Sequence, residues 1–502
     1  MSLDQPTDET PQSSLTKLAI RGASLSGIGY IVAQGLNLAA YIVLARLLTP
    51  DDFGVFAAAT ALLGLTLLFT ESGMTSALVQ RRDRVEEAAN TALLASMASG
   101  LFFGLLALAT APILGAFFDS GTIGAIAAAM AGFVTLRILT VVPDAMMQRR
   151  FAFLRRLIIE PAQVTIFAVA AIVAAENDMG PWSLVIGQYA GALTDVFLAW
   201  ALVRWRPRPR LATIAMWREL VGYGRHVLVA TSILRAGEQS DALIIGKALS
   251  ESALGQFRYA FRVASTPFLL LLSTASYVLF PAFSRIVTET GRFQEAFLRS
   301  LRWMTILGFP LSFALIPLGL PTTVIVFGGQ WDAAGHAAEA MFAYTAAGTI
   351  NSVVSEGLKA AGRPDRLTPM HTVATVVTAG TMLALTPWGL TAAAASMSIG
   401  AVLAAAYAIR QTSRFLDISV SRSLGVMAQP LVAAIVMTIV LIVLESYFDA
   451  ASNGAFTGLM LLAVEGFVGL AVYLNVLALL DRSILSEGRE FAANLRRSRA
   501  AD

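Results

Sequence analysis

Apolar stretches of about 18 or more residues recur along the chain from Ser24 almost to Asp481, and they constrain the fold more than any other feature. Each stretch is long enough for a helix to cross a hydrocarbon core of about 30 Å. Only 14% of the 502 residues are charged, against about 25% in a typical soluble domain. The runs are continuous and do not alternate, so they predict membrane-spanning helices and argue against a β-barrel.

Reading the apolar runs against the polar breaks predicts an all-α polytopic membrane protein with fourteen spans. The predicted spans are 24–46, 54–79, 91–117, 121–143, 161–176, 182–203, 223–247, 255–281, 301–327, 335–358, 367–387, 389–409, 425–446 and 456–480.

The basic residues lie mainly on one side of these spans. Most of the 36 Lys and Arg residues fall in that side's loops, in segments such as "RRDR" at 81–84 and "RWRPRPR" at 204–210. The opposite loops carry acidic residues such as Asp51, Asp52 and Asp449. The positive-inside rule therefore places both termini in the cytoplasm. The formal net charge of +3 is explained by this topology, so we expect no nucleic-acid partner.

An internal repeat relates the two halves of the chain. The segment "LARLLTPDDFGVF" at 44–56 aligns with "IGKALSESALGQF" at 245–257, so that Thr49 and Ser250 occupy equivalent positions of the repeat. Spans one to six thus match spans seven to twelve, and each group starts in the cytoplasm. Such a parallel repeat predicts two lobes with a cavity between them and transport by alternating access.

The repeat also predicts how the chain divides into parts. The two six-helix lobes are joined by a Pro-interrupted basic linker, followed by two further spans and flanked by polar tails. The predicted parts are a disordered cytoplasmic tail at 1–16, an N-lobe at 17–203, the linker at 204–222, a C-lobe at 223–410, the last two spans at 411–480 and a basic cytoplasmic tail at 481–502.

Four sequence segments point to a known family. They are "LARLLTPDDFGVFA" at 44–57, "SALVQRRD" at 76–83, "SDALIIGKALSESALGQFRYA" at 240–260 and "LFPAFSRI" at 279–286. With this helix plan, the chain resembles the oligosaccharide and polysaccharide flippases of the multidrug/oligosaccharidyl-lipid/polysaccharide exporter superfamily.

Within that superfamily the chain is most similar to the O-antigen, exopolysaccharide and lipopolysaccharide translocases. The resemblance implies a transporter of the bacterial inner membrane that is not an enzyme. It would move undecaprenyl-diphosphate-linked oligosaccharide from the cytoplasmic to the periplasmic leaflet. The implied partners are this lipid-linked oligosaccharide, membrane lipids, and a polysaccharide polymerase with other assembly proteins.

The sequence predicts neither a metal site nor a cofactor. Cys is absent, and the three His residues have no partners at metal-binding spacing. The cofactor expectation is limited to coupling with a gradient of H⁺ or Na⁺.

Arginines at bilayer depth are the candidate substrate ligands. Each such charge costs about 2.5–3.5 kcal/mol on insertion scales, so it needs a partner or a wet cavity. Guanidinium groups match phosphate oxygens well. We expect Arg235, Arg258 and Arg262 to hold the pyrophosphate–sugar head group, with help from Arg137. The alternatives are snorkelling for Arg258 and an internal ion pair between Arg235 and Glu238.

Carboxylates within or near the spans are candidate sites for ion coupling, because such groups relay protons or bind Na⁺. These residues are Glu71, Asp195, Glu238, Asp241 and Glu465. We predict the coupling role for Glu238 and Asp241.

Three other functions compete with a flippase. An ion-coupled drug or metabolite antiporter of the same superfamily shares the fold but has little use for clustered Arg. A membrane enzyme of polysaccharide assembly needs catalytic residues in a sizeable loop, whereas every periplasmic loop here is predicted to have about ten residues or fewer, and no catalytic motif occurs. A scaffold would use the basic C-terminal tail to bind lipid or a partner.

Overall fold

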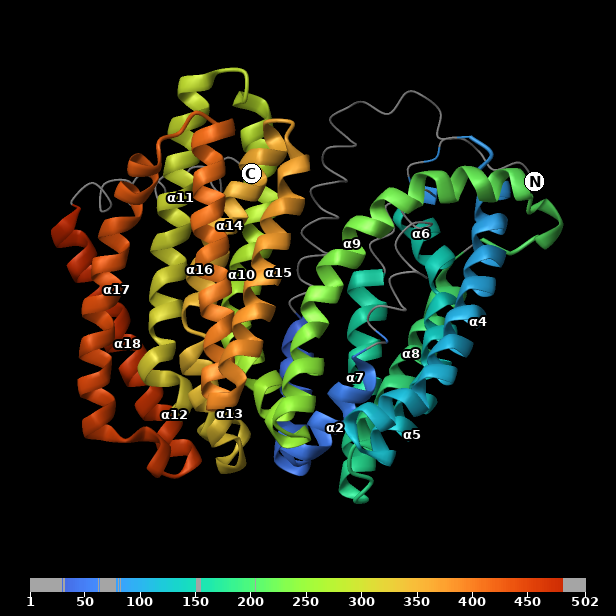
Figure 1. Cartoon of the computed structure of the whole chain (residues 1–502), viewed down its shortest axis with the longest axis horizontal. Coiled ribbons are helices and arrows are strands. Elements are labelled where there is room, and N and C mark those ends of the chain that lie inside the picture. The colour runs from blue at the N-terminus through green and yellow to red at the C-terminus, as the bar shows by residue number, and fades with distance from the viewer. Residues whose placement is uncertain are drawn as a thin grey trace, which may run out of the picture. The chain divides into compact units, whose positions relative to one another are not determined.

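The computed structural model describes residues 29, 32–61, 63, 78–79, 81, 83–149, 155–203 and 205–481. The side chains of 155–156, 222–238, 268, 270 and 272–278 lie outside this description as well. Every regular element in this part of the chain is a helix, which confirms the predicted all-α class (Figure 1). The chain divides into two compact units, Met1–Leu243 and Ile244–Asp502.

The first unit is built on four helix pairings. Within it α4 packs along α5, α7 packs along α8, and α5 also contacts α8 and α2. Its elements are the helix Val32–Leu47, α2 (Pro50–Thr60), α4 (Val85–Phe118), α5 (Gly121–Ile138), α6 (Val141–Arg149), the π-helix η1 (Arg155–Ile159), α7 (Glu160–Glu176), α8 (Trp182–Leu202), the 3₁₀ turn η2 (Pro209–Leu211) and most of α9 (Ile214–Ala248).

In the second unit α14 is central, because it packs against α10, α11 and α16 (Figure 1). Outside it, α17 packs against α11 and α18. The elements are α10 (Glu251–Ile286), α11 (Thr290–Phe313), α12 (Leu315–Phe327), η3 (Gly329–Trp331), α13 (Asp332–Ala340), α14 (Ala343–Ala360), η4 (Pro364–Arg366), α15 (Leu367–Leu385), η5 (Thr386–Trp388), α16 (Leu390–Phe415), α17 (Val420–Phe448), η6 (Ala450–Ser452) and α18 (Ala455–Leu480).

Seven helices in the described residues are long and apolar enough to cross a membrane. They are Val85–Phe118, Gly121–Arg149, Leu157–Glu176, Trp182–Leu202, Leu390–Phe415, Val420–Ser452 and Ala455–Leu480. The bent pair of α11 and α12 raises the number to eight if it counts as one span. All of these coincide with predicted spans, which confirms a multi-pass membrane protein. The full number of fourteen stays a prediction.

The start of α2 explains the polar break in the first repeated segment. Thr49 caps the helix: its hydroxyl accepts from the Asp52 amide at 3.3 Å, and the Asp52 carboxylate accepts from the Thr49 amide at 2.9 Å. Pro50 occupies the first helical position, where its missing N–H costs nothing. The aligned residue Ser250 caps α10 through the Ala253 amide at 3.0 Å. The two aligned positions therefore start helices in the same way, as the predicted repeat requires.

The predicted span 301–327 is two helices, α11 and α12, which meet at a bend of 58°. Pro317 has no N–H to donate to the Phe313 carbonyl four residues earlier, and its ring clashes with that carbonyl in a regular helix. The hydroxyl of Thr438 on α17 donates to the Phe313 carbonyl instead, at 3.2 Å.

The predicted span 335–358 is also broken, between α13 and α14. Here the Ser312 hydroxyl inserts between two backbone groups of the helix. It accepts from the Ala346 amide at 3.0 Å and donates to the Phe342 carbonyl. These two backbone groups are four residues apart and would bond each other in a regular helix. A side chain from α11 therefore shapes the start of α14.

The predicted linker 204–222 contains η2 and the start of α9, and its described part packs on α4. The Thr213 amide donates to the Thr91 hydroxyl at 3.1 Å, and the Arg208 amide donates to the Asn90 side chain. The division between the two units falls later, at Leu243 inside α9. The predicted lobe boundaries stay predictions.

Candidate functional site

The first membrane-embedded charge centre is an ion pair in the first unit. Nη1 of Arg137, near the end of α5, lies 2.7 Å from Oδ2 of Asp195 on α8. The Asp195 side chain is 0% exposed and that of Arg137 is 22% exposed. A carboxylate buried in a span needs such a counter-charge, so this pair joins α5 to α8. Arg137 was predicted to assist the substrate head group, and its pairing with Asp195 was not foreseen.

The second centre is the first part of α10, in the second unit. Arg258 and Arg262 are both half-buried and lie four residues apart, on the same face of the helix as predicted. The Arg262 guanidinium lies 5.8 Å from the centre of the Tyr259 ring, within cation–π range.

This part of α10 is firmly anchored to η3 and α13. The Gln256 amide donates to the Gln330 carbonyl at 2.7 Å and accepts from the Ala334 amide at 2.9 Å. The buried Tyr259 ring lies 3.9 Å from the ring centre of Trp331, which is itself fully buried. Both arginines therefore project from a turn whose position is fixed by neighbouring side chains.

The remaining candidates lie on α9. The side chains of Arg235 and Glu238 fall outside the described residues, so the predicted pair between them stays a prediction. Asp241 is buried at 7% exposure, and the Ala242 amide donates to its Oδ1 at 2.7 Å. Asp241 belongs to the first unit, whereas Arg258 and Arg262 belong to the second.

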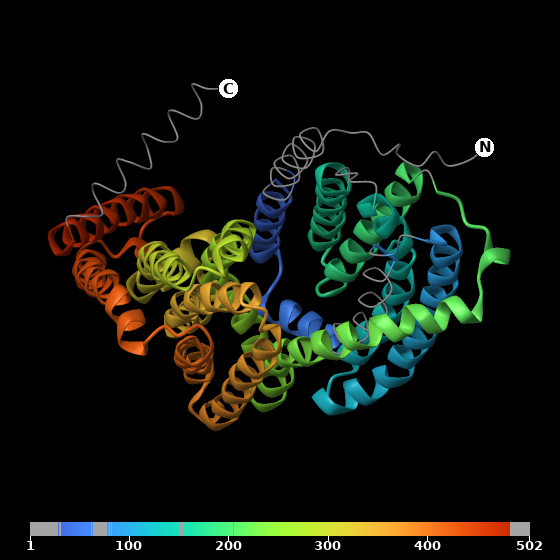
Figure 2. The same cartoon turned by 90° about the horizontal axis from the view of Figure 1, so that it is seen from above.

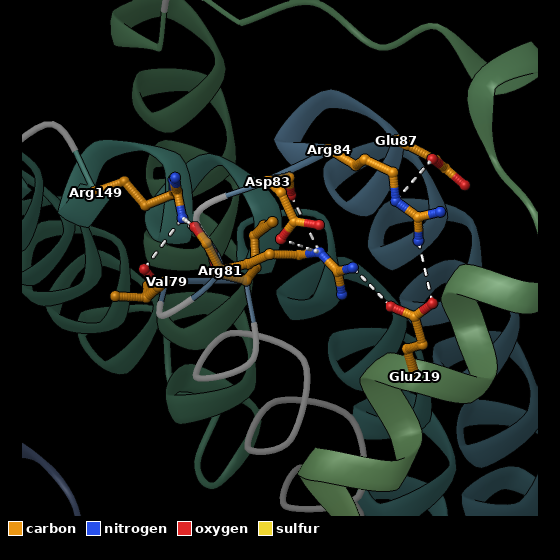
Figure 3. Close-up of polar contacts among 8 residues, drawn as sticks. Val79, Arg81, Asp83, Arg84, Glu87, Arg149 and Glu219 are labelled. Carbon is orange, nitrogen blue, oxygen red and sulfur yellow. Dashed lines mark hydrogen bonds and ion pairs between the residues drawn. The ribbon is translucent and has the colours of Figure 1, made fainter. Parts of the chain in front are cut away.

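A charge cluster outside the predicted spans, which sequence reasoning missed, lies in the first unit (Figure 3). The Glu219 carboxylate on α9 bridges two arginines: it lies 2.6 Å from Nη2 of Arg81 and 3.1 Å from Nη2 of Arg84. The hydrogen bond from Arg81 and the charges of both arginines lower the pKa of Glu219 below its usual 4.5. This cluster ties the segment before α4 to the start of α9.

Arg149, at the end of α6, fixes the same segment from the other side (Figure 3). Its Nη1 donates to the carbonyls of Leu78 at 2.7 Å and Val79 at 3.1 Å, and also to that of Arg81. The sequence segment 76–83, one basis of the family resemblance, thus has a structural role in its described residues. Its basic composition signals a cytoplasmic loop, but nothing in the sequence identifies Glu219 as the partner.

Comparison with known proteins places these features in context. Over residues 43–335 the chain matches the family model described as "Polysaccharide biosynthesis protein". The succinoglycan biosynthesis transport protein ExoT of Rhizobium meliloti is 28% identical over 325 residues, which are 63% of this chain and 64% of ExoT. The teichuronic acid biosynthesis protein TuaB of Bacillus subtilis is 23% identical, over 64% of this chain and 67% of TuaB. The lipopolysaccharide biosynthesis protein WzxC of Escherichia coli is 22% identical, over 64% of this chain and 65% of WzxC. The matched part therefore spans less than two thirds of ExoT and of WzxC.

Two solved structures share the fold. The lipid II flippase MurJ, in an inward closed conformation, superposes with a TM-score of 0.74 at 13% identity and covers 92% of this chain and 99% of its own. An inward-facing multidrug resistance transporter of the MATE family superposes with a TM-score of 0.59 at 16% identity, over 76% of this chain and 94% of its own. At these identities the likeness concerns the fold alone, and it agrees with the fold implied by the sequence resemblance.

Proposed function

The chain belongs to the polysaccharide biosynthesis protein family, and from this premise we propose that it is a transporter of lipid-linked oligosaccharide. It moves an undecaprenyl-diphosphate-linked glycan from the cytoplasmic to the periplasmic leaflet of the bacterial inner membrane, by alternating access of two lobes. The observation that carries the proposal is that the family match, over residues 43–335, includes all four arginines predicted for the head group: Arg137, Arg235, Arg258 and Arg262.

The names of the relatives support a glycan cargo. ExoT is described as a transport protein for succinoglycan biosynthesis, while TuaB and WzxC are named for teichuronic acid and lipopolysaccharide biosynthesis. These three polymers differ from one another, so they do not identify the glycan of this chain. In our proposal the recognised group is the diphosphate, which is independent of the sugar sequence.

Arg258 and Arg262 are the best-supported ligands for this diphosphate. They are separated by about 6 Å along the helix axis, so one ligand of diphosphate size can contact both. Charge-assisted hydrogen bonds from guanidinium to phosphate are short and strong. Because Gln256 and Tyr259 anchor this part of α10, the backbone that bears the arginines is already in place before the ligand binds.

Arg235 is the third proposed ligand and Arg137 the auxiliary one. Arg137 would have to share its guanidinium between Asp195 and a phosphate, so its contribution to binding is the smallest of the four. Glu238 and Asp241 remain the proposed positions for H⁺ or Na⁺ coupling, since both are carboxylates on the helix that bears Arg235.

The test is leaflet accessibility of the lipid-linked oligosaccharide, in cells that lack any other flippase for the glycan. We expect Arg258→Ala and Arg262→Ala each to slow periplasmic delivery about 10- to 100-fold. Loss of a hydrogen bond to a charged group costs about 1.5–3 kcal/mol, and about 1.4 kcal/mol is tenfold. Arg262→Lys should recover only part of the rate, because Lys lacks the planar fork.

Arg292→Ala is the matched control, because Arg292 is an exposed cation of the same unit whose ion pair among the described residues is a local one with Glu289. It should deliver glycan like the wild type. Wild-type delivery by a stably inserted Arg258→Ala/Arg262→Ala variant would contradict the substrate role. Unchanged delivery in cells without this chain would contradict the flippase and favour the antiporter.

A further inference from the structure

The helix α18 has one buried face, and a single charged residue lies on it. The buried residues of α18 are Gly458, Glu465, Gly469, Tyr473 and Leu477. Glu465 lies ten residues after the start of the helix, or about 15 Å along its axis, and therefore deep in the predicted span. A charged residue at this depth marks a functional site by default, and its partner has to be found.

Glu465 is completely enclosed. Its residue is 0% exposed, and among the described residues neither carboxylate oxygen has a hydrogen-bond partner. An ionised carboxylate in such a setting lacks both water and donors, which strongly disfavours the charge. The surroundings of Glu465 therefore have to supply either a cation or a proton.

The side chain that faces Glu465 is another carboxyl group, that of Glu445 on α17. The two carboxyls lie within interaction range of each other, between helices that pack side by side (Figure 2). Glu445 is half-buried, near the end of α17, and its Oε2 accepts from the Ala450 amide at 3.5 Å. Two ionised carboxylates offer each other only acceptors. One added proton converts the contact into a strong O–H···O⁻ hydrogen bond.

The neighbouring elements add no described cation close to this pair. Asp449, exposed at the end of α17, contributes a further negative charge beside Glu445. The sequences of α12 and η6 contain no ionisable residue, and the Tyr473 hydroxyl on α18 donates to the Ile306 carbonyl. The other charged residues on the helices packed against α17 and α18 are distant in sequence from Glu445 and Glu465, or they lie at the opposite end of α18. They are Arg292, Glu295, Arg299, Arg302, Arg410, Arg414, Arg422 and Asp481.

We propose that Glu445 and Glu465 form a site between α17 and α18 that binds one exchangeable proton. Glu465 is the enclosed member, and Glu445 is the member through which the proton enters and leaves, because only Glu445 is partly open. Such a pair titrates as a unit, so the two carboxyl groups share the proton. This site does not rest on the transport proposal, because proton binding is measured without any glycan.

Infrared spectroscopy of the full chain in lipid vesicles tests the proposal, with the C=O stretch of protonated carboxyl groups as the readout. We expect a band at neutral pH that is lost reversibly as the pH rises. Glu465→Gln and Glu445→Gln should each remove it from the difference spectrum against wild type. Glu289→Gln, at an exposed carboxylate of the same unit, should leave it unchanged.

Three results would overturn the site. The first is a spectrum that neither substitution alters, and the second is a band that does not respond to pH. The third is a band that falls when Na⁺ replaces choline at fixed pH, because this would assign the site to Na⁺. Retained elution volume and helical circular dichroism show that each variant is folded. Because Gln matches Glu in size, both variants are expected to pass these checks.

Discussion

Among the described residues, two carboxylates in membrane-spanning helices are fully buried, and they are neutralised in opposite ways. Asp195 in α8 has the Arg137 guanidinium at 2.7 Å, whereas Glu465 in α18 faces the carboxyl of Glu445. A fixed cation neutralises the first permanently, so that pair holds helices together. In our proposal a proton neutralises the second, so that pair can change its charge. Burial alone therefore does not separate a structural acid from a functional one, whereas the partner does.

The largest loss of stability is expected from removing the Asp195 carboxylate. Asp195→Ala takes the counter-charge from Arg137 inside the α5–α8 contact, and breaking a buried pair in this way costs about 3–5 kcal/mol. Thermal unfolding in detergent should therefore show a much lower midpoint than wild type. The double variant Arg137→Met/Asp195→Leu should recover most of the loss, because apolar side chains can replace a buried pair. A wild-type midpoint for Asp195→Ala would show that the pair contributes nothing to stability.

An intermediate effect on stability is expected when the Glu445–Glu465 pair is made to resemble the Arg137–Asp195 pair. Glu445→Lys places a cation beside Glu465, which then stays ionised at all pH values near neutrality. In the wild type, raising the pH removes the shared proton and with it a charged hydrogen bond of about 1.5–3 kcal/mol, so stability should fall as pH rises. The variant should lose this fall, as measured by unfolding midpoints from about pH 4.3, where carboxyls of the unfolded chain ionise, up to the pH at which the folded pair releases its proton. Glu289→Lys is the surface control, and a Glu445→Lys variant that keeps the wild-type pH profile would contradict the shared proton.

The membrane fold could be predicted from the sequence because it depends on local hydrophobicity. The apolar runs located every span that the structure describes as membrane-crossing, and the polar break at Thr49 is a local capping box. The bend at Phe313 has a local signal in Pro317, which the reading of one continuous span overlooked. The break before α14 has no local signal, since it involves Ser312 of another helix.

The candidate site could be predicted only in part, because charges at membrane depth are visible in a sequence but their partners are not. Arg137 and Asp195 were each identified as membrane-embedded, yet they are 58 residues apart and meet only through the packing of α5 on α8. Glu465 was recognised as an intramembrane acid. Glu445, one residue before the end of the predicted span 425–446, is not among the acids that the sequence analysis singles out.

The smallest loss of stability is expected at the charge cluster of Arg81, Arg84 and Glu219, which repeats the Arg–carboxylate chemistry of Arg137 and Asp195 at an exposed position. The Glu219 side chain is 49% exposed, so solvent screens its contacts with Arg81 and Arg84. Glu219→Gln should lower the unfolding midpoint far less than Asp195→Ala does. At about 1 M salt, where the Debye length is about 3 Å, the Glu219→Gln difference should shrink, while the Asp195→Ala difference persists.

Acid should also abolish the difference in unfolding midpoint between the wild type and Glu219→Gln. The pKa of Glu219 is lowered in the folded protein, first by the hydrogen bond from Arg81, so the contribution of Glu219 is complete above its usual pKa of 4.5. It is then lost as the pH falls through the lowered value, where the carboxylate takes up a proton. The midpoints of wild type and Glu219→Gln should therefore converge in acid and in salt. If they stay apart under both conditions, Glu219 acts through packing and not through charge, and the contrast between exposed and buried Arg–carboxylate pairs fails at this position.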